Sequence, residues 1–129
     1  MRQRLYLKSR KYKNHKITIG DETWDSMKEY RRYLELLAMK LNGEIEDLQR
    51  QVKFILIPAQ REPDTIGARG GVHRGKLLEH EVVYYADFVY KDCKTGETIV
   101  EDTKGMRTTD YILKRKMMLY FHKIRIKEV

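Results

Sequence analysis

The sequence predicts one α/β domain in which helices pack against a mixed central sheet. Three observations carry this prediction. A helical apolar spacing covers residues 26–41, strand-like runs rich in valine and tyrosine follow up to residue 104, and a second helical segment precedes a short final strand. A chain of 129 residues can fill one hydrophobic core but hardly two, so residues 1–129 are expected to form a single domain.

The N-terminal segment is strongly basic. Residues 1–16 contain seven Lys or Arg residues and no acidic residue. Residues 1–14 are therefore expected to form a basic arm, in which Lys11 and Lys13 are predicted to contact nucleic acid. The following stretch, KITIGDETW, alternates on both sides of Gly20-Asp21 and is typical of a short hairpin.

A helix is predicted over residues 26–41. Ser26 followed by Glu29 is a capping-box pattern, and Asn42-Gly43 supplies a C-terminal stop. Apolar side chains recur at helical spacing between these signals, at Met27, Tyr30, Leu34, Leu37 and Leu41.

Two strands are predicted next, over residues 52–59 and 78–91. Between them, residues 61–76 contain four glycines and one proline, which interrupt any apolar period. We expect a flexible basic loop beside the substrate, with Arg69 and Arg74 contacting nucleic acid. An insertion without a role is the alternative.

The C-terminal part predicts a turn over residues 92–97, a strand over residues 98–104, a helix from Thr108 or Thr109 to about Phe121, and a final strand around Ile124 and Ile126. The apolar side chains at the end of the helix are expected to belong to the core: Met117, Met118, Leu119 and Phe121.

The formal net charge of +8 is concentrated at the two ends of the chain. Residues 107–127 hold seven basic residues against one acidic residue, and Lys114 and Lys116 are predicted to contact a nucleic-acid backbone. Basic segments gain affinity for phosphates by releasing counterions, so DNA is the expected partner. The alternative is that basic tails only keep the protein soluble, or bind ribosomal or membrane anions.

The sequence also indicates what the protein is not. No segment approaches the roughly 20 apolar residues that span a bilayer, and the N-terminus lacks the apolar centre of a secretion signal, so no membrane partner is expected. Cys93 is the only cysteine, which agrees with a cytoplasmic location and excludes a thiolate zinc cluster.

Charged residues interrupt the apolar strands at two places. Asp87 lies within VVYYADFVY, and Asp102 and Lys104 directly follow Ile99-Val100. Asp102 and Lys104 are two apart and share a strand face, whereas Glu101 points the other way, where it is expected to pair with a basic residue. Magnesium or manganese takes one or two carboxylates together with water and substrate phosphate, so Asp87 and Asp102 are the predicted metal ligands. Lys104 would orient the attacking water.

This arrangement resembles the PD-(D/E)XK nuclease superfamily, in which an Asp on one strand and (Asp/Glu)-x-Lys on the next follow a helix that bears an acid. The stretches WDSMKEYRRYLEL, YYADFVY, ETIVEDTKG and LKRKMMLYFHKIRIKEV are similar to a small phage-encoded family of unknown function assigned to that superfamily, over residues 11–129. The sequence departs from the motif in having Ala86 before Asp87, where the motif has proline, and Asp at position 102, where Glu is commoner.

The resemblance implies a restriction-endonuclease-like fold with Asp87, Asp102, Lys104 and Glu29 as catalytic residues, and with Glu29 as a further metal ligand. It implies a phage endonuclease in the host cytoplasm that hydrolyses phosphodiester bonds with Mg²⁺ or Mn²⁺. Branched or recombination-intermediate DNA would be the substrate, as for junction resolvases. Cutting two strands symmetrically would call for a homodimer.

Other interpretations stay open at this point. Glu29 can serve the capping box alone, and Asp87, Asp102 and Lys104 can be solvated strand positions. A non-catalytic nucleic-acid-binding module is the main alternative function, and a partner for an acidic protein surface is the third.

Overall fold

The central sheet has four strands in the order β10-β9-β8-β3. The computed structural model describes residues 16–103 and 107–129. Three long strands are antiparallel neighbours: β3 (Ile45–Ile57), β8 (Val82–Asp92) and β9 (Thr98–Asp102). The short strand β10 (Lys127–Glu128) runs parallel to β9, so the sheet is mixed, as predicted.

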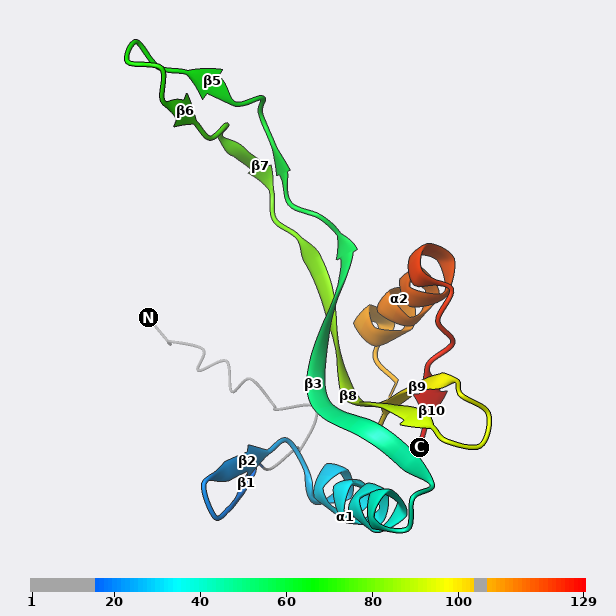
Figure 1. The fold of residues 1–129 in the computed structure, drawn as a ribbon. Coiled ribbons are helices and arrows are strands. Elements are labelled where there is room, and N and C mark those ends of the chain that lie inside the picture. Colours follow the sequence, from blue (N-terminus) through cyan, green and yellow to red (C-terminus); the bar gives the residue numbers. More distant parts are fainter. Residues whose placement is uncertain (1–15, 104–106) are drawn as a thin grey trace, which may run out of the picture.

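One helix lies on each side of this sheet (Figure 1). Helix α1 (Met27–Leu41) precedes β3, and α2 (Thr109–Met117) lies between β9 and β10, continued by the π-helical segment η1 (Met118–His122). The expected order of helix, three strands, helix and strand is therefore confirmed. In the part of the chain that the structure describes, no helix is long and apolar enough to cross a membrane.

Two small hydrophobic cores fill the two sides of the sheet. The α1-side core contains Trp24, Leu36, Ile45, Phe88 and Tyr90. The α2-side core contains Leu56, Tyr84, Ala86, Val100, Tyr111, Met118 and Ile126. Each helix thus covers its own core, because a sheet buried on both faces needs a layer on each.

The hairpin before α1 and the ends of α1 agree with their local sequence signals. Strands β1 (Ile17–Ile19) and β2 (Glu22–Trp24) pair as an antiparallel hairpin. The hydroxyl oxygen of Ser26 accepts the backbone N–H of Glu29 at 3.1 Å, and Gly43 takes a left-handed φ of +75° just beyond the helix. These features form as predicted because their determinants are local.

The apolar stripe of α1 is buried only in part, because Tyr30 alone of its residues packs against the α1-side core. Met27, Leu34 and Leu41 are exposed, whereas Glu29 and Leu36 are the buried residues of the helix. The reason lies in the sheet, which presents polar partners to the helix. The guanidinium of Arg32 donates two hydrogen bonds to buried Glu101, at 2.8 and 2.9 Å, and this rotates a partly polar face of α1 inward.

The core prediction for the end of α2 is correct for Met118 and wrong for Leu119 and Phe121, which are 52 % and 50 % exposed. A π-helix holds more residues in each turn than an α-helix does. Regular α-helical spacing therefore ends at Met117, which packs against the α2-side core, and Met118 is the buried residue of η1.

The β3–β8 pair continues beyond the body as a two-stranded ribbon, which we call the arm (residues 58–81; Figure 1). Within it β4 (Gln60–Arg61) pairs with β7 (Leu77–Glu79), and β5 (Thr65–Ile66) pairs with β6 (Val72–His73). Residues 61–76 were expected to form a loop, but they contain the β5–β6 pair and the second residue of β4.

Two glycines explain why the loop expectation for residues 61–76 was wrong. A Cβ atom at Gly75 would lie 1.7 Å from the carbonyl oxygen of Glu62, so glycine there permits close approach of the two strands of the arm. Gly70, with φ of +81°, forms the tip.

Candidate active site

The β3–β8 pair changes face where Gln51 lies opposite Asp87. Arg50 pairs with Phe88 and Val52 pairs with Ala86, which leaves Gln51 and Asp87 between two regular pairs. Ala86 packs in the α2-side core but Phe88 packs in the α1-side core, although residues two apart on a regular strand share a face. Gln51 has a left-handed φ of +49°, and this local distortion accounts for the exchange of faces.

Two carboxylates meet at this bend. The side-chain amide of Gln51 donates to Glu29 Oε1 at 2.9 Å and to Asp87 Oδ1 at 3.2 Å. Glu29 comes from the first turn of α1 and is 2 % exposed, while Asp87 is half-buried on β8. One neutral amide thus links two acidic groups from elements that are distant in sequence.

The environment opposes ionisation of Glu29. Burial raises the pKa of its carboxyl group, and the nearby charge of Asp87 raises that pKa further, while the hydrogen bond from Gln51 acts in the opposite direction. Arg50 lies at the edge of this pair, with its Nη2 4.0 Å from Glu29 Oε1. Two acidic groups held close together in this way favour binding of a cation.

Asp87 is also tied to the end of β9. Its Oδ2 atom accepts the backbone N–H of Thr103 at 2.8 Å and the hydroxyl of the same residue at 2.7 Å. The carboxylate therefore has a fixed orientation, with one oxygen directed at Thr103 and the other at Gln51.

Asp102 is the last residue of β9, and its side chain lies on the α2 side of the sheet. It is fully buried, and its Oδ2 atom accepts the hydroxyl of Tyr84 at 2.5 Å, within the α2-side core. Burial and the hydrogen bond to Asp102 raise the pKa of Tyr84, which keeps the phenol protonated as a donor. The structure thus brings Glu29 and Asp87 together through Gln51, whereas the predicted partner Asp102 accepts from Tyr84 in the α2-side core.

Glu101 points toward α1, as its position on the strand predicts. It is fully buried between Arg32 and the hydroxyl of Tyr90, which donates to Glu101 Oε2. The prediction that Glu101 pairs with a basic residue is confirmed. Lys104, the remaining predicted catalytic residue, lies outside the described residues.

Within residues 16–103 and 107–129 no group of three or more His, Cys, Asp or Glu residues is placed to hold a metal ion. Magnesium usually binds proteins through only one or two carboxylates and completes its shell with water and substrate phosphate. Glu29 and Asp87 supply two, and their oxygen donors suit a hard divalent cation. The donor chemistry of the pair therefore fits magnesium or manganese.

Sequence reasoning did not find two of the residues that organise this cluster. Gln51 gives no signal in a strand of alternating polar residues, because its role depends on an irregular φ and on two partners elsewhere. Thr103 has no charge to mark it in the sequence, although its position between Asp102 and Lys104 could have suggested a contact with Asp87.

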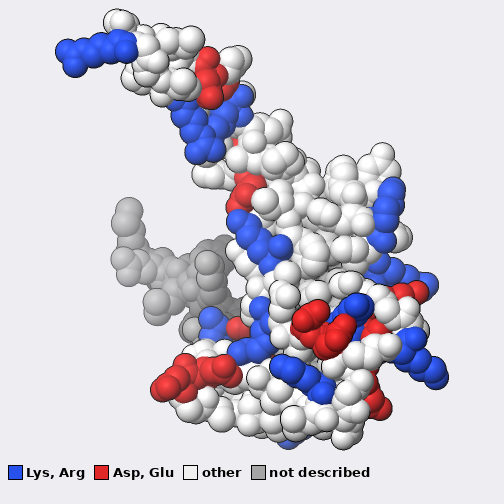
Figure 2. Space-filling model, viewed as in Figure 1, with Lys and Arg blue, Asp and Glu red and all other residues white. Residues whose placement is uncertain are grey.

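The residues predicted to contact nucleic acid lie in different regions. Arg69 and Arg74 are exposed on the arm, where basic side chains stand near its far end and again part of the way down (Figure 2). On α2, Lys114 pairs with Asp110 at 3.6 Å, and Lys116 is exposed. Lys11 and Lys13 lie outside the described residues.

Comparison with known proteins gives one family. A family model described as "Protein of unknown function (DUF1064)" matches residues 9–128, which is nearly the whole chain. Neither the curated proteins nor the solved structures contain a match to the chain.

Proposed function

This chain belongs to the DUF1064 family of unknown function, and we propose that it is a metal-dependent DNA endonuclease of the PD-(D/E)XK type, with a restriction-endonuclease-like fold. One observation carries the proposal. Glu29 on α1 and Asp87 on β8 converge on the amide of Gln51, at a bend in the central strand pair. The order of helix, three strands, helix and strand around this bend supports it.

The acidic pair would hold a divalent cation. When bound there, Mg²⁺ or Mn²⁺ would polarise the scissile phosphate and lower the pKa of the attacking water. Glu29 and Asp87 would be ligands, and Thr103 fixes the orientation of Asp87 through two hydrogen bonds. Following the resemblance, we assign Asp102, the last residue of β9, as a further ligand and Lys104 to orienting the water.

The DNA would lie along the arm and the end of β9. A two-stranded ribbon fits a major groove that is about 12 Å wide. The distal part of the arm, residues 65–76, contains Arg69, Arg74 and Lys76 and no acidic residue, so it would gain affinity from phosphate contacts.

Branched or recombination-intermediate DNA is the proposed substrate class, and a homodimer is the proposed assembly, because a symmetric cut in two strands needs two sites. The outer face of α2 and η1 exposes Leu113, Tyr120 and Phe121, and exposed apolar groups of this kind are typical of contact surfaces between proteins. The proposed setting is the cytoplasm of a phage-infected cell.

The experiment is cleavage of end-labelled four-way, flapped, single-stranded and linear DNA in Mg²⁺, Mn²⁺ or EDTA. Wild type would be compared with Asp87→Asn and Lys104→Ala, and with the matched control Asp21→Asn in the exposed β1–β2 turn. We expect metal-dependent products from wild type and the control only. Cleavage that persists in Asp87→Asn would refute this assignment of the site.

A non-catalytic DNA-binding module is the second candidate. It is favoured by the basic residues of the arm, which can bind DNA without a metal. It predicts equal, metal-independent DNA binding by wild type and Asp87→Asn, with no product from any substrate. The same set of reactions therefore separates the two candidates.

A further inference from the structure

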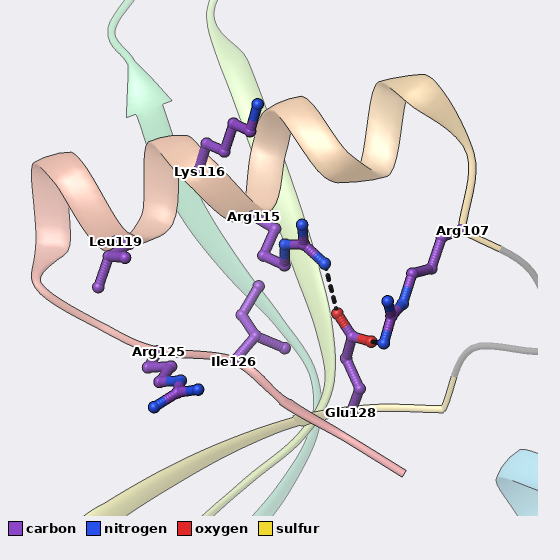
Figure 3. Close-up of a pocket in the computed structure, with 7 residues that line it drawn as sticks. All are labelled: Arg107, Arg115, Lys116, Leu119, Arg125, Ile126 and Glu128. Atoms are coloured by element: carbon purple, nitrogen blue, oxygen red, sulfur yellow. Dashed lines mark hydrogen bonds and ion pairs between the residues drawn. The ribbon is translucent and has the colours of Figure 1, made fainter.

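A basic pocket lies between α2 and the C-terminal segment, on the α2 side of the sheet (Figure 3). Its volume is about 400 Å³. Its walls are formed by Arg107, Arg115, Lys116, Leu119, Arg125, Ile126 and Glu128. Four of these side chains are basic and one is acidic, so the pocket attracts anions.

Glu128 is the acidic member, and two arginines converge on it from different directions (Figure 3). Arg115 Nη1 lies 3.0 Å from Oε1, and Arg107 Nη2 lies 2.5 Å from Oε2. Burial alone would raise the pKa of Glu128, but hydrogen bonds from Arg115, Tyr111 and Arg107 outweigh it and lower that pKa. Glu128 is therefore an anion that holds the two guanidinium groups in place.

The other two basic side chains have no such counterpart. In the described ranges, Lys116 and Arg125 line the pocket, and no acidic side chain is paired with either. Both are exposed. Their charge is available to an anion from outside. Arg107 and Arg115, in contrast, are already paired with Glu128 and could contact that anion only while keeping this pairing.

The pocket adjoins the end of β9. Glu128 on β10 is the register partner of Asp102 on β9. The hydroxyl of Tyr111 donates to Glu128, and the ring of Tyr111 lies 6.5 Å from that of Tyr84, whose hydroxyl donates to Asp102. A chain of direct contacts thus links the pocket to Asp102.

We propose that this basic pocket binds a phosphate group of a nucleic-acid strand, with Lys116 and Arg125 as its first contacts and Leu119 and Ile126 against the attached sugar or base. The inference deepens the proposed function and rests on it only in taking nucleic acid as the ligand. A phosphate is a natural partner because a guanidinium can donate two parallel hydrogen bonds to it. The volume falls in the range of pockets that hold a whole small ligand, which suits a nucleotide unit.

The test measures binding in EDTA, so that no cleavage contributes. Fluorescence anisotropy would follow two labelled single-stranded oligonucleotides that differ only in a 5′-phosphate. Wild type would be compared with Lys116→Gln/Arg125→Gln and with the charge-matched control Arg31→Gln/Lys40→Gln, whose two positions are exposed on α1, across the sheet. We expect about a tenfold loss of affinity for the pocket variant and less than a twofold loss for the control. The slope of log affinity against log salt concentration should also be shallower in the pocket variant, by the amount that corresponds to about two phosphate contacts.

The two oligonucleotides identify which phosphate is bound. If wild type prefers the phosphorylated strand and the pocket variant loses that preference, the pocket takes a terminal phosphate. If the variant loses affinity equally for both strands, the pocket takes an internal one. Equal affinities of the pocket variant and the control for both strands would overturn the proposal.

Glu128→Gln gives an opposite expectation from the same geometry. The amide can still accept from Tyr111 but no longer neutralises Arg107 and Arg115, so affinity for both strands is expected to rise severalfold. A fall as large as that of the pocket variant, with unchanged thermal unfolding, would contradict the proposal. Because this binding is measured in EDTA, a wild type that binds through the pocket but gives no products in Mg²⁺ or Mn²⁺ would contradict the nuclease proposal and leave the pocket proposal standing.

Discussion

Asp87 accepts two hydrogen bonds from a single residue, Thr103, through its backbone N–H at 2.8 Å and its hydroxyl at 2.7 Å. The middle of β8 is thereby fixed to the end of β9. This contact holds the proposed ligand Asp87 against the residue that directly follows Asp102 in the chain. The threonine at the centre of the Asp-x-Lys pattern therefore has a role of its own, which is to orient the carboxylate of Asp87.

The first prediction concerns that hydroxyl. Thr103→Val keeps the side-chain shape and the backbone N–H but removes the hydroxyl donor, and a hydrogen bond to a charged group contributes about 1.5–3 kcal/mol. We expect a roughly tenfold lower single-turnover cleavage rate, since about 1.4 kcal/mol corresponds to a factor of ten. Thr103→Ser, which retains the donor, should restore the rate. Equal rates for the valine and serine variants would show that the hydroxyl does not position Asp87 for cleavage.

The second prediction is a pH dependence. Burial and the charge of Asp87 raise the pKa of Glu29 above its ordinary value of 4.5. A carboxyl group with a raised folded-state pKa stabilises the fold fully below its unfolded pKa, and this stabilisation is lost as pH rises through the folded value. In EDTA, the free energy of unfolding of wild type relative to Glu29→Gln should therefore fall as pH rises from about 4.5 toward neutrality.

Urea unfolding at a series of pH values would measure this difference. Glu44→Gln, which changes an exposed carboxylate, serves as the control. Added Mg²⁺ should reduce the loss in wild type, because a cation favours the ionised carboxylate and stabilises the state that binds it. Parallel pH curves for wild type and Glu29→Gln would contradict the prediction.

The third prediction separates a structural role of Asp102 from a catalytic one. Tyr84→Phe removes the hydroxyl that Asp102 accepts in the buried core, and we expect a loss of about 1–3 kcal/mol in the free energy of unfolding. Tyr85→Phe, at a position that is 51 % exposed, should have little effect. Cleavage by Tyr84→Phe is expected to persist below its unfolding temperature.

Asp102→Asn, by contrast, should lose cleavage while still folded, because an amide is a poorer ligand than a carboxylate. Circular dichroism would establish that the variant is folded at the assay temperature. If folded Asp102→Asn cleaves at the wild-type rate, Asp102 acts only through its contact with Tyr84.

The fourth prediction tests the arm. No residue between 58 and 81 is buried, so replacing residues 62–76 by an Asn-Gly turn between Arg61 and Leu77 should leave both cores intact. Cooperative thermal unfolding should persist within a few degrees of wild type. Affinity for duplex DNA should fall about tenfold, with a weaker salt dependence.

Arg69→Gln/Arg74→Gln in the full-length arm should reproduce most of the loss of affinity, and Glu79→Gln/Glu81→Gln in the same arm should not. Non-cooperative unfolding of the shortened protein would show that the arm belongs to the folded core.

The elements that the sequence predicted well are those with local determinants. The capping contact of Ser26, the left-handed Gly43 and the Thr108 cap of α2 each involve neighbours within a few residues, so the ends of the helices could be located. The buried face of α1 could not, because it depends on the long-range pair of Arg32 and Glu101. The spacing of apolar residues does not reveal the buried face of a helix when that face contains charged residues.

The candidate site follows the same rule. Asp87 and Glu29 were named from the pattern and the resemblance, and the structure brings them into one cluster. The linking role of Gln51 had no sequence signal, because it needs a left-handed residue in the middle of a strand. The roles of Asp102 and Lys104 in catalysis stay predictions, and the variants described above test them.

The bend at Gln51 and Asp87 also determines which face of the arm's two strands points to which side of the body. Strand side chains alternate with a period of two, so one residue gained or lost between Arg50 and Val52 would exchange the two faces of everything beyond it. A residue gained or lost at the Gly70 tip would leave those faces unchanged. Within the family, we therefore expect insertions and deletions to collect at the tip and to be absent from the bend.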